Sequence, residues 1–147
     1  MKNILVILSA FVMCTGATLS ATNHLKPIQL SKVFHQTVDN ADKQLGSPKN
    51  IGLENKFREY EVANGGVLCS ITGNKVTNIV VTSRIPFSSP VDAAASVGID
   101  LNQSKPVSKN VTAWTWKKVK GLPVVTVRSF DGRLWEVIEV SEYVIAE

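Results

Sequence analysis

The residue types that carry out catalysis or bind metals are sparse in this sequence of 147 residues. Its two histidines, His24 and His35, lie well apart, and Cys69 follows on a separate stretch of chain. A structural metal site needs several such ligands at short, fixed spacings, and a nucleophilic cysteine needs a base beside it. We therefore predict no bound metal and no cofactor, and we interpret Cys69 as a small buried apolar residue on a strand.

Paired carboxylates, which can serve general acid–base catalysis, occur at Glu59 with Glu61 and at Glu136 with Glu139. Alternation along a strand would point Glu59 and Glu61 the same way. We interpret both pairs as solvated charges, because the sequence contains none of the motifs of the common enzyme classes. Whether the chain is an enzyme is left open, with no positive support for catalysis.

The most suggestive functional stretch is Trp114-Thr115-Trp116-Lys117-Lys118-Val119-Lys120. Trp114 and Trp116 share one face of the expected strand. If that face meets the helices, both rings belong to the core; if it faces away, they form an exposed aromatic patch bordered by cations. Such a patch is typical of protein-binding surfaces. The candidate partner-binding residues are therefore Trp114, Trp116, Lys117, Lys118, Lys120, Arg128 and Arg133.

Two runs of strand-forming sequence must position these residues. Residues 57–82 divide into three short strands, with turns at Asn64-Gly65-Gly66 and Gly73-Asn74. Residues 112–141 repeat the pattern around Lys120-Gly121 and Asp131-Gly132. Gly-containing pairs between β-branched runs favour hairpins, because primed turns require positive φ. Each run therefore predicts a three-stranded antiparallel meander.

The segment before the first meander has the period of a helix. Apolar residues recur every three or four positions, while polar residues fill the other side. The apolar stripe consists of Leu30, Phe34, Val38, Ala41 and Leu45. Gly46 and Pro48 come next and favour a helix end. We predict one helix over 30–45, followed by a loop over 49–55.

The segment before the second meander repeats this order in a shorter form. Residues 83–90 are rich in Ser and Pro, which is typical of a joint between units. Ser89 is a good N-cap for a helix over 91–97 that ends at Gly98. We predict one α+β domain over 29–147, built from duplicated helix-plus-meander units (29–82 and 89–143) joined by a Ser/Pro linker. Both a single antiparallel sheet with the helices packed on one face and two small lobes satisfy this pattern.

The first 21 residues have the three parts of a secretory signal: Lys2, an apolar run over 4–12, and small residues before a cleavage site. Cleavage fits after Ala17 or Ala21, and we favour Ala21, with a flexible lead-in over 22–28. The mature chain is then expected in the periplasm or outside the cell. No later apolar run is long enough to span a membrane. The formal net charge of +4 is too mild to require anionic lipid, and export argues against nucleic acid as a partner.

The layout resembles the family that contains β-lactamase inhibitor proteins and the small lipoprotein of the outer-membrane barrel-assembly machinery. The resemblance is carried by Leu45-Gly46-Ser47-Pro48, Tyr60 and Gly73-Asn74-Lys75-Val76-Thr77-Asn78-Ile79. The inhibitors also contain two tandem units. The lipid-bearing cysteine of the assembly protein and the two disulfides of the inhibitors have no counterpart here. The resemblance implies a fold and a habit of binding other proteins, without a particular target.

These features are compatible with three functions. We expect a non-enzymatic module that binds another protein of the cell envelope, such as an inhibitor or an immunity-type protector of an enzyme acting there. The first alternative is an accessory protein of envelope assembly that binds peptidoglycan or an outer-membrane protein. The second is a small-molecule carrier or enzyme that uses a cavity between sheet and helices. The oligomeric state is left open.

Overall fold

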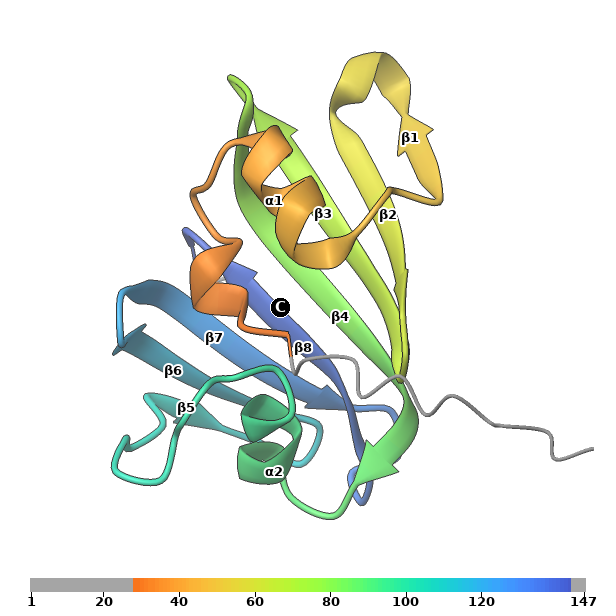
Figure 1. Cartoon of the computed structure of the whole chain (residues 1–147). Helices are drawn as coiled ribbons and strands as arrows, with labels where there is room; N and C mark the ends of the chain where they lie inside the picture. The colour runs from red at the N-terminus through yellow and green to blue at the C-terminus, as the bar shows by residue number, and fades with distance from the viewer. Residues whose placement is uncertain (1–27, 144–147) are drawn as a thin grey trace, which may run out of the picture.

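A computed structural model describes residues 28–143. Within this range the chain forms one eight-stranded antiparallel sheet with two short α-helices (Figure 1). The fold is therefore mostly β, a more strand-rich fold than the predicted α+β domain. The predicted signal peptide and the lead-in up to residue 27 lie outside the described residues. No helix within the described range is long and apolar enough to cross a membrane.

The strands follow the turn signals of the sequence. The first meander consists of β2 (Phe57–Val62), β3 (Gly65–Thr72) and β4 (Lys75–Phe87). The second consists of β6 (Ala113–Val119), β7 (Leu122–Ser129) and β8 (Trp135–Ser141), while β1 (Asn50–Gly52) and β5 (Ser108–Lys109) are short edge strands. The sheet order is β1-β2-β3-β4-β8-β7-β6-β5, so β4 and β8 join the two meanders at the centre. Both meanders share one sheet and are not separate lobes.

The helices α1 (Val38–Leu45) and α2 (Pro90–Ala95) lie on the same face of the sheet (Figure 1). The second helix begins as predicted: Ser89 Oγ accepts a hydrogen bond from the Asp92 backbone N–H at 3.1 Å, and Pro90 opens the first turn. Each half of the chain thus runs through a helix, a short strand and three longer strands. Descent of the two halves from one duplicated unit stays a prediction.

The predicted helix over 30–45 is wrong in its first half. Leu30–Lys32 form a single 3-10 turn, and His35 has a left-handed φ of 60°, which breaks the helical path. Residues 35–38 pair instead with the start of β4, where His35 N donates to Val76 O at 2.9 Å. The pairing of β8 with β4 ends at Ser141 and Asn78, so the earlier residues of β4 take this segment as their neighbour.

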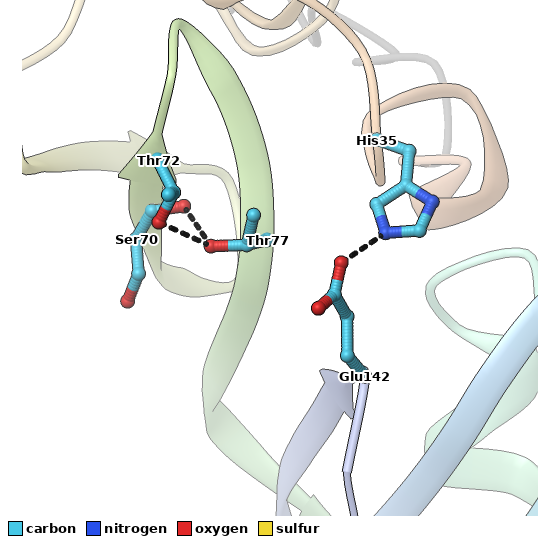
Figure 2. A network of polar contacts seen from close by, with 5 residues as sticks. All are labelled: His35, Ser70, Thr72, Thr77 and Glu142. Carbon is cyan, nitrogen blue, oxygen red and sulfur yellow. Dashed lines mark hydrogen bonds and ion pairs between the residues drawn. The ribbon is translucent and has the colours of Figure 1, made fainter.

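A contact between side chains closes this junction (Figure 2). His35 Nε2 and Glu142 Oε1 lie 2.8 Å apart, which ties the segment before α1 to the residue that follows β8. The His35 ring also stacks on Phe34, with the ring centroids 4.1 Å apart. About half of the His35 side chain is exposed, so this contact joins the two segments at the protein surface and not in the core.

A β-bulge lies beside this junction, at Thr77 (Figure 2). The register between β3 and β4 shifts there, and the Thr77 hydroxyl donates to the backbone carbonyl of Ser70 at 3.4 Å. The extra residue resets the alternation of side chains along β4. Val76 and Ile79, which would otherwise face opposite sides, are therefore both fully buried.

Two other predicted boundaries were wrong. The expected loop over 49–55 contains β1 and a short 3-10 turn, Leu53–Asn55. The expected linker is strand up to Phe87, because Ser83 pairs with Gly65 and Phe87 pairs with Trp135. Pro86 is tolerated because β4 makes no pair with β8 between Thr82 and Phe87, so the absent N–H of proline costs no ladder bond.

The core lies between the helices and the sheet face that they cover. Its apolar residues come from every long strand and from both helices. One polar network crosses it, in which Asp42 of α1 accepts hydrogen bonds from Arg58 Nη1 and, at 2.7 Å, from the Tyr60 hydroxyl. Burial raises the pKa of the Tyr60 phenol, and the Asp42 carboxylate raises it further. The network ties α1 to β2.

Candidate binding surface

The tryptophans of the predicted patch lie on the helix-covered face of the sheet. Trp116 is 1% exposed, and its Nε1 donates to the backbone carbonyl of Ser104 at 3.1 Å. Trp114 is half-buried between Trp116 and Trp135, with ring centroids 6.0 Å and 5.8 Å away. The rings therefore belong to the core, which is one of the two alternatives that the sequence left open.

The cations of the predicted patch lie at different places. Lys117, Lys118 and Lys120 are at the end of β6 and the following turn, where Lys120 Nζ lies 2.9 Å from Asp100. Arg128 pairs in register with Ala113, at the opposite end of β6, roughly 20 Å away along the strand. Its Nε lies 3.7 Å from Glu139 on the sheet face that the helices leave open. The structure therefore keeps Arg128 apart from the three lysines, which lie together at one end of β6.

Arg133 belongs to the loop between β7 and β8, which is held by its own polar groups. Asp131 Oδ1 accepts hydrogen bonds from the backbone N–H of Arg133 and of Leu134, both at 2.8 Å. Ser129 Oγ donates to the same oxygen at 3.0 Å and accepts from Gly132 N at 2.8 Å. One carboxylate and one hydroxyl thus fix the path of residues 129–134.

The same loop is docked against the turn that precedes β6. Ser129 N donates to Thr112 O at 2.8 Å. Gly132 has φ of 74°, and a Cβ placed there would come within 2.7 Å of Val111 Cγ1. Glycine is therefore required both by the backbone conformation and by the close approach of Val111.

Four large apolar side chains are exposed at this end of the sheet. Phe130 is 77% exposed and Val111 76%, while Ile85 and Leu134 are 60% and 41% exposed. Pairing of Phe87 with Trp135 brings the last part of β4 alongside the β7–β8 loop, as Figure 1 also shows. We call this group the apolar tip; it consists of Ile85, Val111, Phe130 and Leu134.

Charged side chains of both signs lie around the apolar tip. Asp131 and Arg133 are both exposed and carry opposite charges. Arg84, next to Ile85, lies 2.5 Å from Glu61. The backbone N–H groups of Leu134 and Arg133 lower the pKa of the Asp131 carboxyl, so it is ionised at neutral pH. The tip therefore combines apolar side chains with charges of both signs, including Lys109, whose Nζ lies 3.8 Å from the centroid of the Trp114 ring.

Sequence reasoning named only Arg133 of this region as a candidate binding residue and interpreted Asp131-Gly132 as a turn. The signal was available in part, because a large aromatic residue directly before Asp-Gly has no obvious place in a buried strand. The contributions of Ile85 and Val111 could not be read from the sequence. They depend on which loops meet at one end of the sheet.

The residues that could carry chemistry are dispersed. Cys69 is fully buried, and burial raises the pKa of its thiol to about 12. Glu61 is engaged by Arg84 and Lys49, which lower the pKa of its carboxyl, and Glu139 by Arg128. Within residues 28–143 no three His, Cys, Asp or Glu side chains are grouped so that they could hold a metal ion. His24 lies outside the described residues.

A cavity of about 180 Å³ lies on the helix-covered face, between the end of α1, the β2–β3 turn and the residues after α2. Its apolar lining consists of Ile28, Leu45, Val62, Ala63, Val81, Phe87, Val97 and Ile138. Polar side chains from Gln44, Glu61, Asn64, Ser83 and Ser96 complete the wall. We call this space the inter-helix cavity.

Comparison with known proteins does not assign the chain to a family. No protein-family model and no curated protein sequence matches it. Among solved structures it is similar to a cysteine-rich secretory protein from Staphylococcus aureus subsp. aureus Mu50, with 11% identity and a TM-score of 0.42. The match covers 75% of this chain and 45% of the staphylococcal chain, so the chain spans less than half of that protein. A likeness at this level assigns no function.

Proposed function

We propose that the chain is an exported, non-enzymatic protein that binds another protein through the apolar tip. The exposure of Phe130 on an internally bonded loop carries this proposal. Aromatic side chains dominate the energetics of protein interfaces. A loop that is already ordered loses little conformational freedom when it binds, so more of the contact energy appears as affinity.

A protein partner suits the tip better than a lipid surface does. Peripheral binding to anionic membranes relies on clusters of Lys and Arg beside the apolar residues. Here Arg133 is accompanied by Asp131, and Arg84 by Glu61. We therefore infer a partner with an apolar pocket that receives Phe130. The resemblance to inhibitor proteins supports a protein as the partner, and the signal-like first 21 residues support export.

The test is capture of a partner from an envelope extract by the purified chain and its variants. Phe130→Ala removes the ring at the tip, and Leu53→Ala removes a side chain of similar exposure from the β1–β2 connection as a control. We expect the wild-type chain and Leu53→Ala to retain one protein in fixed stoichiometry, and Phe130→Ala to lose it.

Two outcomes would overturn the proposal. If folded Phe130→Ala captures the same proteins as the wild type, the tip is not the binding surface. If the wild-type chain instead sediments with lipid vesicles and this depends on Phe130, the tip binds membranes rather than a protein.

A further inference from the structure

The inter-helix cavity differs from the apolar tip in both position and shape. It is concave, and Val81, Val97 and Ile138 form its buried wall on the covered face of the sheet. Leu45 and Val62 are half-buried at its sides. Its volume of about 180 Å³ is similar to that of enclosed apolar cavities of about 150 Å³ that take up benzene, and here the rim at Gln44, Glu61 and Asn64 is open to solvent.

The polar groups around the cavity are mostly occupied within the protein. Ser96 Oγ donates to Ala93 O at 2.6 Å, and Ser83 Oγ donates to Ile85 O at 2.6 Å. Glu61 has Arg84 at 2.5 Å and Lys49 at 3.4 Å, so its charge is neutralised by neighbouring cations. The wall therefore offers apolar contact and no unbalanced charge.

From the volume, the lining and this charge balance, we infer that the inter-helix cavity binds a small, uncharged, aromatic or branched apolar molecule. A charged ligand would have to break the pairs that Glu61 makes with Arg84 and Lys49, whereas an apolar ligand can bind against the apolar wall without disturbing them. This binding goes beyond the proposed function, because the tip residues Val111, Phe130 and Leu134 are not part of the cavity wall.

Titration with toluene tests the inference, followed by the methyl signals of Val81, Val97 and Ile138 in nuclear magnetic resonance spectra. We expect saturable shifts confined to the cavity. Val62→Phe places a larger side chain in the cavity wall and should abolish these shifts. Val80→Phe makes the same substitution at a half-buried site on the other face of the sheet and should retain them.

The absence of saturable shifts in the wild-type chain would overturn the inference. Toluene binding by folded Val62→Phe as tight as in the wild type would also overturn it. Should Val62→Phe fail to fold, Ala63→Phe at the exposed edge of the cavity gives the same readout. Phe130→Ala should bind toluene normally, so failure of the proposed protein binding and failure of this inference can be told apart.

Discussion

Asp131 organises its surroundings through a single oxygen atom. Its Oδ1 accepts from two backbone N–H groups and one hydroxyl, and these bonds hold the loop that carries Phe130. The side chain that makes the tip rigid is thus distinct from the one that would contact a partner. Sequence reasoning located Asp131-Gly132 as a turn, but it could not foresee that the carboxylate bonds to residues two and three positions further on.

Asp131→Ala should therefore loosen the loop while the sheet stays folded. We expect the amide hydrogens of Arg133 and Leu134 to exchange several-fold faster, because they lose their acceptor. Asp100→Ala is the control: it removes an exposed carboxylate that is bonded to Lys120 and lies in another loop. Unchanged exchange in Asp131→Ala would show that the loop is held by other contacts.

The pH dependence of the same loop has a defined sign. Backbone N–H groups lower the pKa of the Asp131 carboxyl in the folded protein. A carboxyl group whose pKa is lowered in the folded protein stabilises the fold fully at pH values above its pKa in the unfolded chain. This stabilisation is lost as the pH falls through the pKa that the group has in the folded protein. Protection of Arg133 and Leu134 in wild type should thus persist through mildly acidic pH. Its loss near neutral pH would contradict this assignment.

At the scale of elements, the close approach of β3 and β4 depends on Gly65. A Cβ at Gly65 would lie 1.9 Å from Thr82 O, whereas one at the neighbouring Gly66 would meet nothing nearer than 3.9 Å. The two glycines occupy the same strand and the same turn region, so they form a matched pair. Sequence patterns identified both as turn residues and could not separate their roles.

Gly65→Ala should destabilise the fold by about 2 kcal/mol, because the added methyl group forces β3 and β4 apart where they pair. Gly66→Ala should change the free energy of unfolding by less than about 0.5 kcal/mol. Urea denaturation of both variants measures the difference. Equal stabilities for the two variants would show that β3 and β4 are less closely paired than the register indicates.

The predicted helix over 30–45 failed for a reason that lies in the sheet. The apolar spacing was real, since Leu30, Phe34, Val38 and Ala41 are all buried. A 3-10 turn followed by a short helix buries the same stripe as one continuous helix would. What decides between them is the start of β4, which pairs with residues 35–38. The apolar spacing within residues 30–45 cannot show that residues 35–38 pair with a strand that comes later in the chain.

At the scale of the whole molecule, the strands could be predicted from the sequence and the proposed binding surface could not. Turn pairs such as Gly73-Asn74 and Lys120-Gly121 mark chain reversals locally, so both meanders were located correctly. The apolar tip combines residues 85, 111, 130 and 134, which meet only because β4 and β8 join the two meanders. Trp114 and Trp116 were named as candidate residues of an exposed patch, but their side chains lie on the face of the sheet that the helices cover.

The central claim is that the chain acts by contact through Phe130, and site-specific photo-crosslinking in the producing cells tests it most directly. The photoreactive residue p-benzoylphenylalanine is introduced at position 130 and, as a control, at position 53. Irradiation should join the chain to one envelope protein from position 130 and to none from position 53. No adduct from position 130, or the same adducts from both positions, would contradict the claim.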